Sequence, residues 1–201
     1  MFLLSPAKAG GLRYDMLMRE RAQFDVALKL REGAATIGEV YSFISGLYFR
    51  GKMAYAQAFD NAPPGVPGAL VIVPGAGLVP CDTPVTIEQL RATEDIPVDE
   101  HNDTYRDALL RAARLLNEHA GPACLYVLLG SIASGKYTSP LLEVFGERLV
   151  FPADFVGRGD MSRGGLMLRH ARSGNELSYV AVKGAVRHGA RPPKLERWRN
   201  V

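Results

Sequence analysis

The stretch Leu125–Lys136, with the sequence LYVLLGSIASGK, most constrains what this chain can fold into. It passes directly from an apolar segment into a turn rich in glycine and serine, and we expect a helix from about residue 139. In an open α/β sheet, ligands bind where such turns open at the carboxyl ends of strands. We therefore predict a buried central strand over residues 124–129 and a ligand-binding loop after it.

Other segments predict the same fold class. Residues 2–4 and 69–73 are short apolar runs, and the unbroken apolar character of 69–73 suits a parallel sheet that is covered on both faces. Helical spacing of apolar residues predicts helices over 12–31, within 38–59 and over 104–120. Strands that alternate with helices indicate an α/β protein with a mixed, mainly parallel sheet flanked by helices. The remaining predicted segments are a loop over 74–84, a short helix over 87–90, an acidic loop over 93–103, a helix over about 139–146, a flexible segment from 157, and strands over 148–152 and 178–182.

The length of 201 residues predicts a single domain over 1–186, followed by a basic, proline-containing tail over 187–201. No apolar run approaches the roughly 18–20 residues that span a bilayer. The apolar run at residues 1–4 is too short for a signal peptide, and no basic residue precedes it. Two cysteines without a C-x-x-C pairing suit a reducing compartment, so we expect a cytoplasmic protein with no membrane partner.

Positive charge is concentrated in the last quarter of the chain. Residues 1–147 carry 13 Lys and Arg against 17 Asp and Glu, whereas residues 148–201 carry 11 against 4. Clustered cations either keep a protein soluble or form a surface for polyanions. Arginines interleaved with glycines over 157–172 could approach a phosphate together with the backbone, or could extend along the surface from a packed helix.

Residues Gly130–Lys136 satisfy G-x-x-x-x-G-K, most of a phosphate-binding loop. A true loop places Ser or Thr directly after the lysine to bind magnesium, but Tyr137 stands there and Thr138 comes one position late. On a helix, one position turns a side chain by about 100° away from the ligand. We therefore expect a tight turn, or a loop for another anion or small molecule, rather than a nucleotide-hydrolysing loop.

Metal and nucleophile motifs are lacking in the sequence. The four histidines are scattered, without a second His or Cys at ligand spacing. There is neither a G-x-S-x-G turn nor a recognisable Ser-His-Asp order. Cys81 is followed by Asp82, whose carboxylate would raise the pKa of the thiol and disfavour a nucleophile. We predict no metal and no cofactor.

Five short motifs occur in order along residues 3–169: Leu3–Lys8, Gly38–Tyr41, Gly77–Pro84, Ala133–Tyr137 and Arg163–Arg169. In the same order they are similar to I-S-P-A-K, G-D-V-Y, G-L-L-R-P-L-D, A-S-x-E-Y and A-R-G-x-M-x-R, and together they resemble the YaaA family of bacterial peroxide-stress proteins. The resemblance implies an α/β core with a positively charged cleft, DNA binding and protection of DNA under oxidative stress. The chain departs from the family pattern because it is shorter, has Lys136 where the family has an acidic residue, and lacks P-Y-R-x-E-M around 85–100.

The residues and the resemblance together predict one cleft that binds DNA or a nucleotide-like anion. Lys8, Arg163 and Arg169 would hold phosphates, and Tyr41 or Tyr137 would stack on a base. An alternative is an enzyme that acts on a nucleoside, base or other small metabolite, with Lys8 or Tyr137 as acid/base groups. A third alternative is a partner-binding protein without catalytic activity. The full predicted site comprises Ser5, Lys8, Tyr41, Gly77, Asp82, Ser134, Tyr137, Arg158, Arg163 and Arg169.

Overall fold

The computed structural model describes residues 1–195 and contains one six-stranded sheet with strand order β3-β2-β1-β4-β5-β6. The last six residues of the predicted basic tail, 196–201, which include Trp198, lie outside the described residues. The strands are β1 (Phe2–Leu4), β2 (Ala69–Val73), β3 (Gly77–Pro80), β4 (Tyr126–Leu129), β5 (Leu149–Pro152) and β6 (Tyr179–Ala181).

The four inner strands are parallel, and the two edge strands are antiparallel to their neighbours. Strand β1 lies at the centre, where Leu3 pairs with Leu70 on one side and Leu128 on the other. All three β1 residues are buried, as an apolar strand covered on both faces requires. The predicted class, a mixed and mainly parallel α/β sheet flanked by helices, is confirmed.

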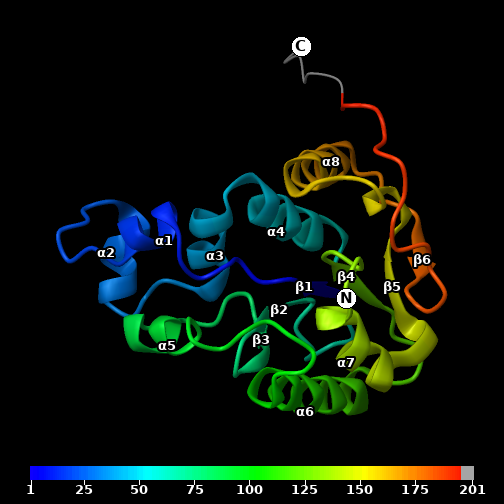
Figure 1. Ribbon diagram of the computed structural model, residues 1–201, viewed down its shortest axis with the longest axis horizontal. Helices are drawn as coiled ribbons and strands as arrows, with labels where there is room; N and C mark the ends of the chain where they lie inside the picture. The colour runs from blue at the N-terminus through cyan, green and yellow to red at the C-terminus, as the bar shows by residue number, and fades with distance from the viewer. Residues whose placement is uncertain (196–201) are drawn as a thin grey trace.

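Helices cover both faces of the sheet (Figure 1). On one face lie α3 (Ile37–Ser45), α4 (Leu47–Phe59) and α8 (Asp160–Ser173), and on the other lie α6 (Asp103–Ala120) and α7 (Gly135–Phe145). The short helices α1 (Leu12–Leu17), α2 (Asp25–Arg31) and α5 (Ile87–Ala92) lie to the left of the sheet in Figure 1. Two 3-10 turns, η1 (Gly146–Arg148) and η2 (Ala153–Phe155), flank β5.

Three predicted segments differ from the structure. The single helix expected over 12–31 is divided into α1 and α2 by irregular residues 18–24. The loop expected over 74–84 contains β3, an edge strand that forms a hairpin with β2 and therefore tolerates Pro80. The segment expected to be flexible from 157 enters helix α8 at Asp160.

Helix α7 begins four residues earlier than predicted and contains Pro140. A proline inside a helix has no N–H for the carbonyl of the residue four positions earlier. That carbonyl belongs to Lys136, and the hydroxyl of Tyr105 on α6 donates to it at 2.8 Å. The neighbouring helix thus satisfies the carbonyl that the proline leaves open.

Candidate functional site

The carboxyl ends of β1 and β4 form a topological switch point. From β1 the chain passes through α1–α4 to β2 on one side, whereas from β4 it passes through α7 to β5 on the other side. Two neighbouring parallel strands therefore send their loops in opposite directions, which opens a crevice between the loops. In open α/β sheets ligands bind at such a point.

A cleft of about 600 Å³ lies at this point, and we call it the carboxyl-edge cleft. The segment after β1, the junction of α3 and α4, the loop after β4 and the first turns of α7 and α8 contribute to its walls. Its lining residues are Ser5, Pro6, Lys8, Gly10, Gly11, Leu12, Arg13, Tyr14, Ile44, Ser45, Tyr48, Ser131, Lys136, Tyr137 and Asp160.

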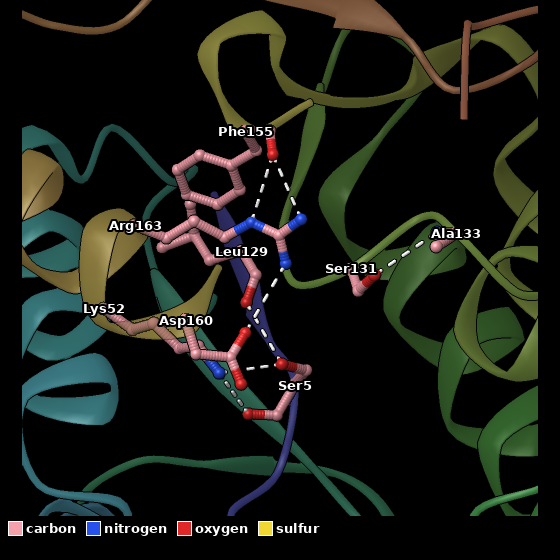
Figure 2. A network of polar contacts seen from close by, with 8 residues as sticks. All are labelled: Ser5, Lys52, Leu129, Ser131, Ala133, Phe155, Asp160 and Arg163. Carbon is pink, nitrogen blue, oxygen red and sulfur yellow. Dashed lines mark hydrogen bonds and ion pairs between the residues drawn. The ribbon is translucent and has the colours of Figure 1, made fainter. Parts of the chain in front are cut away.

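Lys52 of α4 lies directly behind this cleft and is completely buried. Its Nζ donates to the carbonyl oxygen of Ser5 at 2.8 Å and to Ser5 Oγ at 2.7 Å (Figure 2). The same Nζ lies 3.9 Å from the centroid of the Tyr48 ring. Within the described residues no carboxylate forms an ion pair with it.

Burial lowers the pKa of Lys52 from its usual 10.5 to about 7, because the charged amine loses its hydration. The negative charge of Asp160 opposes this shift, and the positive charge of Arg163 adds to it. Lys52 can therefore exist as an ammonium or as a neutral amine near neutral pH.

Ser5 follows the last residue of β1 and separates Lys52 from the cleft. Its side chain lines the cleft although the residue is only 4% exposed. Besides accepting from Lys52, Ser5 Oγ lies 3.4 Å from the carbonyl oxygen of Leu129, to which it donates. A ligand in the cleft would thus contact Ser5, and Lys52 would act through the serine hydroxyl.

Two residues of α8 complete the polar network in Figure 2. Arg163 donates from Nε and Nη2 to the carbonyl oxygen of Phe155, at 3.2 and 3.0 Å. Its Nη1 forms an ion pair at 3.6 Å with Asp160, whose side chain is 68% exposed. The guanidinium is therefore held inside the protein, whereas the Asp160 carboxylate faces solvent at the cleft.

Two tyrosine hydroxyls in the cleft wall are buried without a hydrogen-bond partner in the described structure, those of Tyr14 and Tyr48. Buried polar groups are normally satisfied, and each of these phenols has a polar side chain nearby: Glu94 beside Tyr14, and Ser5 and Arg163 beside Tyr48. Burial raises the pKa of Tyr48 to about 12 and also raises the pKa of Tyr14 and Tyr137. The three phenols therefore keep their protons at neutral pH and can donate.

Close contact between α4 and α8 brings these groups together. A Cβ on Gly51 would lie 2.6 Å from the carbonyl oxygen of Gly164, and a Cβ on Gly164 would lie 2.7 Å from that of Leu47. Only glycine allows the two backbones to approach so closely. The crossing places Lys52 and Tyr48 of α4 beside Arg163 of α8.

A second cavity of about 340 Å³ adjoins the cleft and shares Pro6, Lys8, Lys136 and Tyr137 with it. Tyr41 lines this second cavity. Lys8 is exposed, and Lys136 Nζ lies 5.0 Å from the centroid of the Tyr137 ring. The two lysines thus stand where the two compartments meet.

Several predicted site residues meet here. Ser5, Lys8 and Tyr137 line the carboxyl-edge cleft, and Tyr41 lines the second cavity. Arg163 lies in the polar network beside the cleft. Tyr41 is only 2% exposed and packs edge-on against Phe49, so the structure does not present its ring for stacking on a base.

The structure does not bring the other predicted residues into the cleft. Gly77 packs against α6, where a Cβ would lie 2.5 Å from the carbonyl oxygen of Ala108. Asp82 follows the end of β3, and because β3 runs antiparallel it lies at the opposite edge of the sheet. Arg158 donates to the carbonyl oxygens of residues 154 and 193 and to the hydroxyl of residue 162. Arg169 and Ser134 line neither cavity.

The G-x-x-x-x-G-K match is a strand-to-helix turn in the structure. Gly135 begins α7, and the carboxylate at the end of the Glu100 side chain lies where a Cβ of residue 135 would stand. A carboxylate at this glycine would repel the phosphate that a nucleotide loop holds there. That this is not a nucleotide-hydrolysing loop stays a prediction, which rests on Tyr137 and on this carboxylate.

Sequence reasoning missed Lys52, Tyr14 and Tyr48. The signal for Lys52 was its spacing, because it stands four residues after Tyr48 and three before Tyr55 on the buried face of α4. A lysine on an apolar helical face is costly unless its amine finds partners. The tyrosines gave no such signal, since aromatic residues on helices are ordinary core residues.

Comparison of the chain with protein-family models, curated proteins and solved structures gave no match. The resemblance to the YaaA family therefore stays a prediction. Among residues 1–195, no group of three or more His, Cys, Asp or Glu side chains is placed to hold a metal ion. No helix in that range is long and apolar enough to cross a membrane.

Proposed function

We propose that this protein is an enzyme that acts on a small anionic metabolite in the carboxyl-edge cleft, with Lys52 as the group that transfers protons. The observation that carries the proposal is the fully buried Lys52 amine, hydrogen-bonded to a serine that lines the cleft. A buried amine without an ion-pair partner destabilises a fold. Strongly perturbed groups of this kind cluster at functional sites.

The pKa of Lys52 supports a role in proton transfer. General acid–base catalysis is most efficient when the pKa of the catalytic group lies near the operating pH. Burial brings the pKa of Lys52 to about 7, so both protonation states are populated at neutral pH. An ordinary surface lysine, with a pKa of about 10.4, would be almost entirely charged.

The lining residues indicate the class of ligand. Lys8, Arg13 and Lys136 supply positive charge, which favours a phosphate or carboxylate group. Tyr14, Tyr48 and Tyr137 supply phenol donors and aromatic walls for a ring or other flat group. A nucleoside, base or similar small metabolite that carries an anion combines these features.

Thermal-shift measurements with separate ligand classes test the proposal. We expect nucleoside monophosphates or inorganic phosphate to raise the melting temperature, because a ligand that binds only the folded state stabilises it. Lys8→Gln and Lys136→Gln should reduce the shift, whereas Arg111→Gln, which removes an exposed charge on α6 outside both cavities, should preserve it. If no small anion raises the melting temperature, the proposal is wrong.

Binding of DNA is a second candidate, because cations line an open cleft and the sequence resembles a DNA-binding family. Stabilisation by an oligonucleotide, but by no nucleotide or phosphate, would favour it over the enzyme. Protection under oxidative stress stays a prediction of the resemblance alone.

A further inference from the structure

We propose that Ser5 is a nucleophile activated by Lys52, and that the cleft hydrolyses an ester or amide that carries an anionic group. This inference rests on the proposed function, because it names the chemistry of the same cleft. It requires a hydroxyl open to the substrate, a base in contact with that hydroxyl, and donors for the negative charge that develops on the acyl oxygen.

The first two requirements are met by Ser5 and Lys52. The distance of 2.7 Å between Ser5 Oγ and Lys52 Nζ lies within the range for a nucleophile and its base. A second bond from Nζ to the Ser5 carbonyl oxygen, at 2.8 Å, and the adjacent Tyr48 ring fix the position of the amine. A neutral amine in this position donates to the carbonyl and accepts the hydroxyl proton. Serine–lysine pairs replace the Ser-His-Asp arrangement on some folds.

Two phenols beside Ser5 meet the third requirement. Tyr48 and Tyr137 both line the cleft, and the Tyr48 hydroxyl has no hydrogen-bond partner in the described structure. Burial raises the pKa of Tyr48 and Tyr137, and the neighbouring Ser5 side chain partly offsets this effect on both. Both phenols therefore lie beside the proposed nucleophile, where a protonated donor would stabilise an oxyanion.

The reaction balances with water as the second reactant. Ser5 Oγ forms a bond to the acyl carbon while its proton passes to Lys52 Nζ. The carbon–oxygen or carbon–nitrogen bond of the substrate then breaks, and the leaving group takes that proton. A water molecule next gives a proton to Lys52 and attacks the acyl carbon. The acid leaves, and Ser5 recovers its proton from Lys52.

Labelling with diisopropyl fluorophosphate tests the inference, because the reagent phosphorylates activated serines and releases fluoride. Intact-mass and peptide analysis should show one adduct, on Ser5. Ser5→Ala and Lys52→Met should lose it, whereas Ser134→Ala, which changes an exposed serine outside both cavities, should retain it. The labelling rate of the unmodified chain should rise about tenfold per pH unit below pH 7 and level off above it, as Lys52 loses its proton.

The pH profile is measured on the unmodified chain, so it tests the inference even if the Lys52→Met variant fails to fold. An adduct elsewhere, no adduct, or a labelling rate that does not change between pH 5 and 9 would overturn the inference. An equal rate in a folded Lys52→Met variant would also overturn it. Stabilisation by small anions without labelling would leave the proposed function standing and remove only the serine chemistry.

Discussion

At the scale of single residues, Lys52 is the feature that sets this protein apart from an ordinary α/β core. A helix that covers a sheet usually buries apolar side chains, and a buried ammonium replaces strong hydration with a few contacts. Here the contacts are two oxygens of Ser5 and the face of Tyr48. They offset part of the lost hydration, and the lowered pKa shows that burial outweighs them.

The lowered pKa of Lys52 predicts how stability depends on pH. Below about pH 7 the amine is charged in both the folded and unfolded chain, so the cost of burying the charge is fully present. Between about pH 7 and 10.5 only the unfolded chain keeps the proton, so stability rises with pH. Each unit of pKa difference corresponds to about 1.4 kcal/mol, so the gain amounts to several kcal/mol.

Urea unfolding of the unmodified chain and of Lys52→Met, at pH 6 and pH 9, isolates this effect. The methionine variant loses the titrating amine but retains the side-chain volume. We expect the unmodified chain to gain free energy of unfolding relative to the variant as the pH rises. A difference that stays constant from pH 6 to pH 9 would show that Lys52 titrates as an ordinary surface lysine.

At the scale of elements, the crossing of α4 and α8 determines the geometry of the site. Gly51 and Gly164 let the helix backbones meet, and Lys52, the residue after Gly51, reaches Ser5 at the end of β1. Glycine weakens a helix by about 1 kcal/mol relative to alanine. The close contact between the two backbones explains why glycine stands at both positions despite this cost.

Alanine substitutions at three glycines test this account. Gly51→Ala places a methyl group 2.6 Å from the Gly164 carbonyl, so the helices must separate, and we expect a loss of about 1–3 kcal/mol of stability. Gly165→Ala is the matched control, because its methyl group would meet only Leu195 Cδ1 at 3.5 Å. The control should be neutral or stabilising by up to about 1 kcal/mol, measured by urea unfolding. Equal effects of Gly51→Ala, Gly164→Ala and Gly165→Ala would contradict a close crossing.

The strands of the inner sheet were predictable because their signal is local. Unbroken apolar runs such as 69–73 require burial on both faces, and the structure places this run as β2 with the same bounds. The start of α7 was not predictable in this way. Pro140 indicated the beginning of a helix, and the partner that satisfies the Lys136 carbonyl, Tyr105, comes from a different helix.

The candidate site was predicted only in part, for a similar reason. Ser5, Lys8 and Tyr137 follow strands or begin a helix, so the rule for carboxyl ends of strands finds them. Lys52 enters the site from the middle of α4, through packing between segments that are far apart in sequence. A glycine within a helix gives no sign in the sequence that another helix packs on it, and in the structure Gly51 and Gly164 join α4 and α8 in this way.

At the scale of the whole molecule, three arginines of the basic C-terminal part form hydrogen bonds within the fold. Arg148 donates to Gly121 and Asn117 and lies against the Tyr126 ring. The bonds of Arg158 and Arg163 to backbone carbonyls are likewise internal. The excess of Lys and Arg in residues 148–201 therefore does not place an equal number of cations at the cleft. The charged residues that line the cleft are Lys8, Arg13, Lys136 and Asp160.

This distribution predicts how strongly salt affects any binding of DNA. Each phosphate that a protein neutralises contributes about −0.9 to the slope of log affinity against log salt concentration. Three cations in the cleft, Lys8, Arg13 and Lys136, therefore give a slope of about −3. Fluorescence anisotropy of a labelled duplex between 20 and roughly 200 mM NaCl measures it. Lys8→Gln and Lys136→Gln should each make the slope shallower by about 1, whereas Arg111→Gln should leave it unchanged. A slope of about −6 or steeper would mean that DNA contacts a basic surface outside the cleft, and the carboxyl-edge cleft would then not be the DNA site.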